Sequence, residues 1–297
     1  MMNMRIKLLT SILIASTSIC NCFAEPTTVV YKINPAPISP RDFMIVDSIR
    51  SSLMRKVEPG SWLDSDANDG DGAGTIFFAN NALVIYNETA VHKKIQNQKS
   101  MRKKIVPVKK KSVPLLSGIE ELKDVASELQ KKISVKFDEE PLRNAINTIA
   151  RESKIDIKID SKSLRDLGIA VDVPVNCEIK NVSTLAALEQ TLKEVDRRLT
   201  WSVKGKELLV TTISTSEDAL TKKTYKTSRF NLQNVNHKLT QEALAQIISY
   251  NVDMTSWGVV GGPGQIEVLN NGDMVIKQTT RNHVKIQALL AYIADAS

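Results

Sequence analysis

The 297-residue chain has few of the side chains on which enzymes and metal proteins usually depend. It contains three histidines and three cysteines, and 5% of its residues are aromatic. Two cysteines, Cys20 and Cys22, lie near its start, so loss of that segment would leave only Cys177 and no intrachain disulfide. No nucleophile, base and acid recur in a catalytic pattern. We therefore expect no enzymatic activity and no cofactor. A secreted hydrolase is the least favoured of three functional classes, after a protein-interaction role and binding to an anionic polymer.

Beyond its first residues, the sequence has no apolar run long enough to cross a bilayer. At the start, Arg5 and Lys7 precede an apolar run at 8–16 and a small-x-small site at 22–24, the pattern of a signal peptide. We expect cleavage after Ala24 and a periplasmic or secreted protein. A retained anchor and lipid attachment at one of the two early cysteines are the alternatives. An exported chain of this size without disulfides looks bacterial.

Acidic residues are missing from one stretch of the chain. Loss of Arg5 and Lys7 with the signal lowers the formal net charge from +7 to +5, and the stretch 93–111 carries nine Lys or Arg residues with no acid. The stretch is expected either as a solvated linker or as an electrostatic contact with membrane lipid, a cell-wall polymer or an acidic partner. The candidate interaction residues there are Lys103, Lys104, Lys109, Lys110 and Lys111.

The chain contains an internal repeat. One copy ends in "LVIYNETAVHKKIQ" and the other in "MVIKQTTRNHVKIQ", and the landmarks before these strings follow in the same order. The matched residues include Tyr31 with Tyr225, Trp62 with Trp257, Gly74 with Gly264, Thr89 with Thr280 and His92 with His283.

Hydrophobic periodicity predicts the same βαββα order for both copies. In the second copy an Asn-Asn-Gly turn at 270–272 joins the last two strands, and Thr280 is the expected N-cap of the final helix. In the first copy the apolar stripe of that helix is lost after one turn, so we expect it to fray or pack differently. The middle of the chain predicts a βαββαββ order, with Cys177 packed as a small hydrophobe.

The fold class predicted is therefore α+β, with three small modules after a signal peptide. Modules of 70–80 residues are near the lower limit for independent folding, so packing between them is expected to matter. The predicted divisions are a signal peptide at 1–24, a first repeat at 27–101, a basic linker at 102–129, a middle module at 130–213 and a second repeat at 222–297.

The middle module resembles the secretin and TonB N-terminal short domain, through "ISVKFDEEPLRNAINTIARES", "VNCEIKNVSTLAALEQTLKEV" and "LTWSVKGKELLVTT". The flanking copies resemble the secretin N1-like unit, through "EALAQII" and "GQIEVLNNGDMVIKQTTRNHVKIQALLAYI". These units combined with the "SW…GG.G.I" turn also look like exported proteins of planctomycete type. The resemblance implies an envelope protein whose modules dock on one another or on partners. No secretin pore or outer-membrane barrel follows the modules in this sequence, so neither channel nor transporter activity is expected.

The stretch "SWLDSDANDGDGAGTI" at 61–76 suggests a calcium loop. Counted from Asp64, its residues Asp66 and Asn68 fit the pattern, but position six is Asp69 instead of Gly and position twelve is Thr75 instead of Glu. The second copy has no carboxylate there. We expect a solvated turn with at most weak calcium binding, and Asp64, Asp66 and Asn68 are the weak metal candidates.

Other motifs have structural explanations. The stretch "GVVGGPG" at 258–264 lacks the features of a phosphate loop and has no basic neighbours, so neither phosphate nor nucleic acid is the expected ligand. His92 and His283 are expected to bond back to their helix caps, and His237 stands alone. Trp62 and Trp257 are either core residues or exposed contact anchors.

These observations predict a non-catalytic envelope protein that mediates protein–protein interaction or assembly. Its expected partner is an envelope protein or a second copy of the chain. The alternative function is binding to an anionic envelope polymer or a membrane surface through the basic stretch 93–111.

Overall fold

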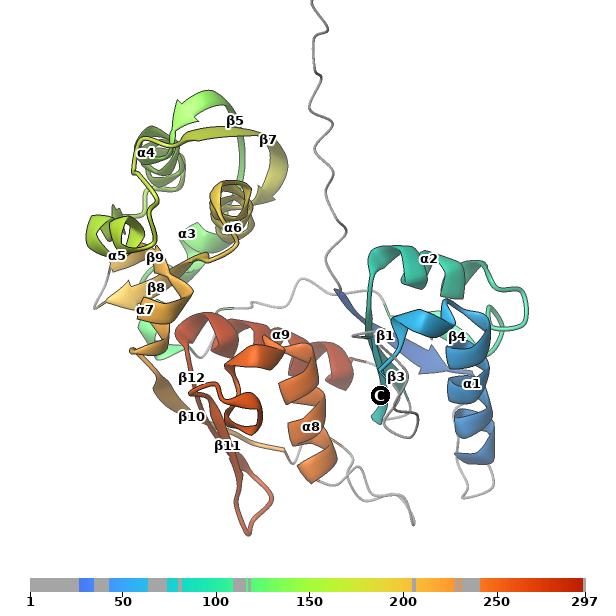
Figure 1. The fold of residues 1–297 in the computed structure, drawn as a ribbon. Helices are drawn as coiled ribbons and strands as arrows, with labels where there is room; N and C mark the ends of the chain where they lie inside the picture. The colour runs from blue at the N-terminus through green and yellow to red at the C-terminus, as the bar shows by residue number, and fades with distance from the viewer. Residues whose placement is uncertain are drawn as a thin grey trace, which may run out of the picture.

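The computed structural model has the expected α+β class, with small sheets that are each covered by helices (Figure 1). It describes residues 27–34, 43–63, 74–79, 82–108, 116, 119–204, 207–227, 230 and 241–295. The predicted signal peptide lies outside these residues. Within them, no helix has both the length and the apolar character needed to span a membrane.

The first unit is an antiparallel sheet of strand order β2-β3-β1-β4 with two helices. Its interior combines side chains from the sheet and both helices, among them Tyr31, Ile49, Leu53 and Ile95. Its elements are β1 (Thr27–Ile33), α1 (Phe43–Lys56), β2 (Thr75–Ala79), β3 (Ala82–Asn87), α2 (Thr89–Asn97) and β4 (Ile105–Pro107).

The third unit has the same order of elements around an antiparallel sheet of order β10-β12-β11. The Asn-Asn-Gly segment turns the chain between its last two strands, with Gly272 at φ +85°, a conformation that favours glycine. Its elements are β10 (Thr221–Tyr225), α8 (Gln241–Asn251), β11 (Gln265–Val268), β12 (Met274–Gln278) and α9 (Thr280–Ala294).

The middle unit has two small sheets, β5-β7 and β6-β9-β8, around one apolar core. Its strands β6 and β9 are parallel and the other pairs are antiparallel. The short helix α5 interrupts the expected order, and Cys177 packs against the core as predicted. The elements are α3 (Ala126–Gln130), β5 (Lys132–Pro141), α4 (Leu142–Ser153), β6 (Ile157–Ile159), α5 (Ser161–Asp166), β7 (Pro174–Ser183), α6 (Thr184–Val195), β8 (Leu199–Lys204), β9 (Glu207–Thr212) and α7 (Ile213–Glu217).

The first sheet is buried on both faces. Tyr31 and Ile85 point into the first unit, whereas Val30 and Val84 belong to the core of the third unit. Since successive strand residues alternate between faces, the two helices of the first unit cover one side and α8 and α9 cover the other. One face of the first sheet therefore belongs to the core of the third unit, while its other face forms the separate core of the first unit.

Helix α9 lies at the junction of all three units (Figure 1). Its residues Ile286 and Leu290 are buried in the third unit, while Val284 is part of the core of the middle unit. At its other end, the Tyr292 hydroxyl donates a hydrogen bond to the Val108 carbonyl, 3.0 Å away. One amphipathic helix thus contacts each unit with a different part of its surface.

The range 102–129, expected as a basic linker, contains regular structure. Strand β4 pairs with β1, and Leu122 and Leu129 are fully buried in the core of the middle unit. The apolar residues between the lysines account for this difference, because they gain more by burial than an extended linker allows. The range also includes Lys109, Lys110 and Lys111, which lie outside the described residues.

The two copies differ at their final helices, as the lost apolar stripe predicted. Helix α2 ends after 9 residues, whereas α9 continues for 15. After α2 the chain turns through Met101, which is buried, and enters β4. Because α2 ends early, the chain returns to the sheet and forms β4 as its edge strand. Among its described residues, the third unit has no strand that corresponds to β4.

Candidate functional site

The two tryptophans occupy equivalent buried positions. Trp62 is 1% exposed and Trp257 is 2% exposed. The indole nitrogen of Trp62 donates to the Val57 carbonyl at 2.7 Å, and that of Trp257 donates to the Val252 carbonyl at 2.6 Å. Because each ring and its single donor are used internally, the tryptophans are core residues, and the alternative of exposed contact anchors is wrong.

A glycine packs beside each tryptophan. Trp62 forms a parallel bridge with Gly74, and Trp257 forms one with Gly264. A Cβ on Gly264 would lie 2.7 Å from the Ser256 carbonyl oxygen, so only glycine fits without a shift of the backbone. This close approach explains the predicted tight turn after Trp257, whereas the turn predicted after Trp62 lies at 64–73, outside the described residues.

A polar side chain at the end of each third strand holds the same turn. The amide nitrogen of Gln278 donates to the Ser256 hydroxyl at 2.8 Å, and that of Asn87 donates to the Ser61 hydroxyl at 3.1 Å. The roles of Asn87 and Gln278 were not predicted from the sequence, although the Ser-Trp pair that they hold occurs in both copies and is a signal for this contact. Glu58 and Asp253, which lie three residues before these serines, have φ angles of 46° and 36°.

The two matched histidines do not bond back to their helix caps. Nδ1 of His92 lies 3.0 Å from the Tyr31 hydroxyl, and its Nε2 lies 2.9 Å from the Thr27 carbonyl. His283 makes the same pair of contacts, at 2.8 Å to Tyr225 and 3.0 Å to Thr221. The expectation was wrong because both rings turn from the helix start toward the first strand of their own unit.

The contacts fix the tautomer of each ring. A carbonyl oxygen only accepts, so Nε2 carries the proton, and Nδ1 of the neutral ring accepts from the tyrosine hydroxyl. Burial lowers the pKa of His92 and of His283, which favours this neutral form. Burial raises the pKa of Tyr31 to about 12, so the phenol keeps its proton. The histidines therefore act as structural links between the first strand and the last helix of each unit.

The start of α9 also differs from prediction by one residue. The N-cap is Thr279, whose hydroxyl accepts from the Asn282 amide at 3.2 Å, and Thr280 is the first helical residue. In the first copy the cap position is Glu88, which makes no side-chain cap bond. The preceding strand ends at Gln278, and Thr279 is the last residue with extended backbone before the helix, which is the geometry that an N-cap requires.

Charged residues connect the middle and third units. The Arg281 guanidinium contacts Glu189 of α6 at 3.2 Å and Asp253 at 3.3 Å, and Lys285 contacts Asp253 at 2.6 Å. Burial alone would raise the pKa of Asp253, but Lys285 and Arg281 outweigh it and hold that pKa below its usual value. Burial lowers the pKa of Lys285, and so does the charge of Arg281.

An apolar turn projects from the third unit. Val259 is 88% exposed and Val260 is 59% exposed, on the short 3-10 helix η5 (Gly258–Val260). The turn is held by backbone hydrogen bonds from Gly262 to the Trp257 carbonyl and from Gly264 to the Ser256 carbonyl, at 2.9 and 2.8 Å. This valine turn, residues 258–264, is therefore a rigid structure that presents two apolar side chains to solvent.

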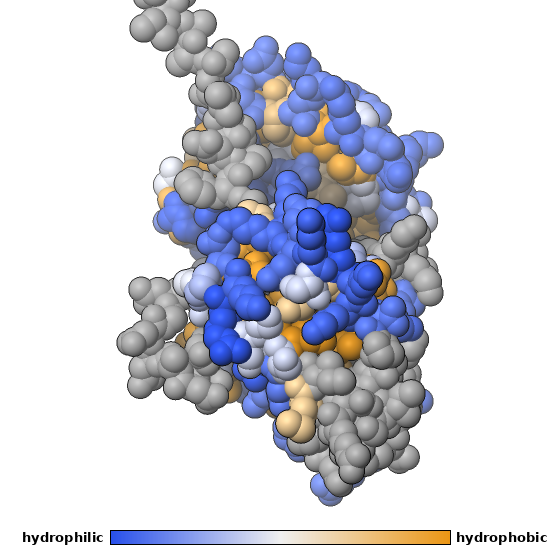
Figure 2. All heavy atoms as spheres, turned by 90° about the vertical axis from the view of Figure 1, so that its right-hand side faces the viewer, coloured by the Kyte–Doolittle hydropathy of each residue, from blue (hydrophilic) through white to orange (hydrophobic). Residues whose placement is uncertain are grey.

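Some of the remaining candidate site residues lie within the described ranges, and others lie outside them. Lys103 and Lys104 are exposed in the turn before β4, and the side of the molecule seen in Figure 2 is mostly hydrophilic, with small hydrophobic areas between. Asp64, Asp66, Asn68 and His237 lie outside the described residues. Among the residues that the structure describes, no group of three His, Cys, Asp or Glu side chains is placed to hold a metal ion.

Comparisons with known proteins give little sequence similarity. No family model matches the chain, and no curated protein matches it. A solved structure of XcpQN012 is 12% identical, with a TM-score of 0.21, and the match covers 55% of this chain and 65% of that one. The GspC–GspD complex of the type II secretion system of enterotoxigenic Escherichia coli is 11% identical, with a TM-score of 0.20, covering 54% and 97%.

Both solved structures contain N-terminal domains of secretins, the class of module that the sequence resembles. The chain spans 65% of the length of the first of them. TM-scores of this size do not establish a common fold, and membership of the secretin class stays a prediction from the sequence.

Proposed function

We propose that the protein is an exported, non-catalytic component of the cell envelope that mediates protein–protein interaction or assembly. The single observation that carries this proposal is the valine turn, where Val259 and Val260 are exposed on a backbone held by internal hydrogen bonds. A rigid apolar projection loses little conformational entropy when a partner covers it, which is the property of an interface anchor.

The two copies support a contact role for this turn. Both use the same internal frame of tryptophan, glycine and a strand-end amide, so this frame serves the fold and leaves the turn free to differ. In the first copy the corresponding sequence is rich in aspartate, whereas in the second it is apolar. The frame is the same although the turn sequences differ, so the frame does not account for the exposure of the two valines.

The test uses the mature chain from Glu25 and its V259D/V260D variant. The matched control, N97D/S100D, adds the same charge at two exposed positions of the first unit. Light scattering and chemical cross-linking in envelope extract would be performed on all three proteins. We expect a dimer or a defined cross-linked complex with the parent chain and the control, and its loss in V259D/V260D. Identical behaviour of all three proteins would contradict a contact at the valine turn.

The proposal includes three modules, with the range 102–129 divided between the first and the middle one, and removal of the signal peptide after Ala24. Export would place the protein in the periplasm or outside the cell. N-terminal sequencing of the protein recovered from an envelope fraction tests both points. A chain that begins at Glu25 supports them, and a chain that keeps Arg5 and Lys7 contradicts them.

A second function, binding to an anionic polymer or membrane surface through the stretch 93–111, is favoured by one observation. The basic side chains of this stretch that the structure describes are all exposed, on α2 and in the turn that follows. Exposed charges act on a partner through solvent, so this binding should weaken steeply as salt rises. A strict monomer that sediments with anionic cell-wall material at low salt, and is released by added salt, would favour this function.

A further inference from the structure

A cleft of about 730 Å³ lies where the three units meet, and the valine turn is not part of its lining. One wall is α6 and the residues after it, and the other is α9, while Thr27 and Thr28 of β1 close one end. Its volume is within the range of small-molecule pockets, roughly 300–1,000 Å³. The site exists only when the three units are assembled, since each contributes to its lining.

The walls of the cleft are basic. Glu189 and Lys193 are four residues apart on α6, and Arg281 and Lys285 are four apart on α9, while Arg197 lies in the turn after α6. Residues four apart share one face of a helix, so each helix presents two charged side chains on one face to the cleft. The lining contains four cationic side chains and two carboxylates, Glu189 and Asp253.

The two carboxylates are already engaged by the α9 cations. Arg281 contacts both of them, and Lys285 contacts Asp253. Lys193 also acts on the Asp253 carboxylate through its charge, while Arg197 is exposed at the rim. Even with all of these interactions satisfied, the cleft holds two more positive than negative groups.

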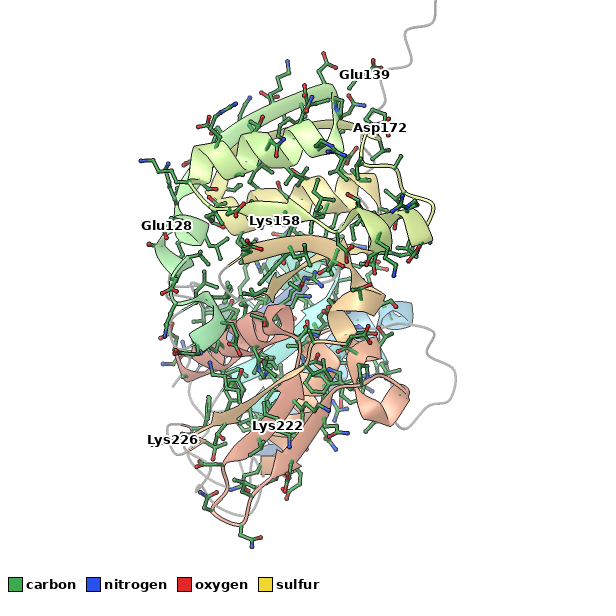
Figure 3. The ribbon with its side chains drawn as sticks, turned by 90° about the vertical axis from the view of Figure 1, so that its left-hand side faces the viewer. Glu128, Glu139, Lys158, Asp172, Lys222 and Lys226 are labelled. Atoms are coloured by element: carbon green, nitrogen blue, oxygen red, sulfur yellow. The ribbon has the colours of Figure 1, made fainter. Side chains whose placement is uncertain are left out.

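This excess is local. Figure 3 shows labelled charged residues of both signs on another side of the molecule, pointing outward from separate elements of the middle unit and from the region of β10. Charges dispersed in this way lie in solvent or in exposed pairs, such as Lys158 with Glu207, which contribute little. In the cleft, by contrast, cations from α6, the turn after it and α9 act on the same partly open space, and its low-dielectric walls strengthen their field.

From this geometry we infer that the cleft binds a compact ligand with several phosphate charges, held by Lys193, Arg197, Arg281 and Lys285. Arginine pairs with phosphate through two parallel N–H donors, and lysine supplies a point charge. Thr27 lines the same space and its hydroxyl can donate to a phosphate oxygen, whereas the Thr28 hydroxyl already donates to Oδ1 of Asn251 at 3.1 Å. The cleft is small for a folded acidic protein segment, which makes a phosphate compound the better fit.

The test is calorimetric titration of the mature chain with tripolyphosphate at low salt. The K193Q/R197Q variant removes two exposed cations from the rim and leaves the ion pairs of Arg281 intact. Because exposed charge contacts contribute about 0.5 kcal/mol each, the affinity should fall about five- to tenfold. The K222Q/K226Q control removes the same charge from two exposed lysines in the region of β10 that do not line the cleft, and it should bind as the parent does.

Further binding experiments show whether the phosphate belongs to a lipid headgroup or to a free compound. Vesicles of phosphatidylglycerol and phosphatidylcholine present it as a lipid headgroup, and binding there that depends on Lys193 and Arg197 would support the cleft with a lipid as ligand. Poly-glutamate that binds as tightly as tripolyphosphate would overturn the preference for phosphate. Absence of binding by the parent chain, or equal losses in both double variants, would overturn the site. This inference does not depend on the valine turn, whose variant should bind tripolyphosphate normally.

Discussion

The hydroxyl oxygen of Tyr225 lies 2.8 Å from Nδ1 of His283, and their ring centroids are 5.9 Å apart at an angle of 24°. Tyr31 and His92 repeat this arrangement in the first unit, at 3.0 Å, 6.0 Å and 23°. Each pair joins the first strand of a unit to its last helix, across a separation of about 60 residues. The pairs therefore fix the contact between sheet and helix within each unit.

Removal of a tyrosine hydroxyl should destabilise the protein without altering its shape. Y225F leaves Nδ1 of His283 buried with no hydrogen-bond donor, which costs about 1–3 kcal/mol of unfolding free energy. Urea denaturation followed by tryptophan fluorescence measures the loss. Y250F is the matched control, because Tyr250 is 36% exposed, and it should stay within about 0.5 kcal/mol of the parent.

Stability should fall as pH drops below about 6.5. His92 and His283 have lowered pKa values in the folded chain because they are buried, whereas the unfolded chain takes up protons near the ordinary histidine pKa of about 6.5. The unfolded state thus binds more protons below that pH, and the stability present above it is progressively lost. Denaturation between about pH 7.5 and about pH 5 measures this slope.

The double variant H92Q/H283Q provides the control for this slope. Glutamine has no titrating group, so the dependence between about pH 6.5 and about pH 5 should largely disappear. Carboxylates with lowered pKa values, such as Asp253, lose their contribution only near about pH 4 and below. A slope that persists in the double variant would assign the effect to other groups.

The glycine beside each tryptophan should tolerate no side chain. In G74A the new Cβ would overlap the Asn87 side chain and lie 2.5 Å from the Ser61 carbonyl oxygen. Such overpacking costs about 1–3 kcal/mol of unfolding free energy, measured by urea denaturation. G60A, three residues before Leu63, meets no atom within 4 Å and should be nearly neutral. Equal effects of the two substitutions would contradict the close approach.

Arg281 should couple the middle unit to the third. R281M keeps the apolar stem but leaves Glu189 without this partner and Asp253 with only lysine nearby, at a cost of about 1–3 kcal/mol in unfolding free energy. The control is R198M, because Arg198 is exposed and pairs with Asp196 two residues away. It should change stability by about 0.5 kcal/mol or less. Thermal and urea unfolding of both variants make the comparison.

Local features of the fold were predictable because they depend on neighbouring residues. The Asn-Asn-Gly segment predicted a hairpin since those residues accept positive φ, and Gly272 has that conformation. The loss of apolar residues after Ile95 predicted a shortened final helix in the first copy. The N-cap of α9 was displaced by one residue because two adjacent threonines fit the same pattern, and only the strand end decides between them.

The candidate sites were less predictable because they depend on distant contacts. Exposed lysines at 103 and 104 were found from charge alone, but the basic cleft joins helices about 90 residues apart, and no local pattern reports that Lys193 and Lys285 face one space. The exposure of Val259 was equally hidden, since two valines between glycines read as part of a buried turn.

The sequence by itself determined the α+β class, the repeated order of elements and the residues that each unit buries, because apolar periodicity and turn residues act over a few positions. The tertiary structure alone decided that α9 touches all three units, that the first sheet is covered on both faces and that histidines bond to tyrosines instead of to helix caps. The physical reason is that an apolar face favours burial but does not specify which surface will cover it.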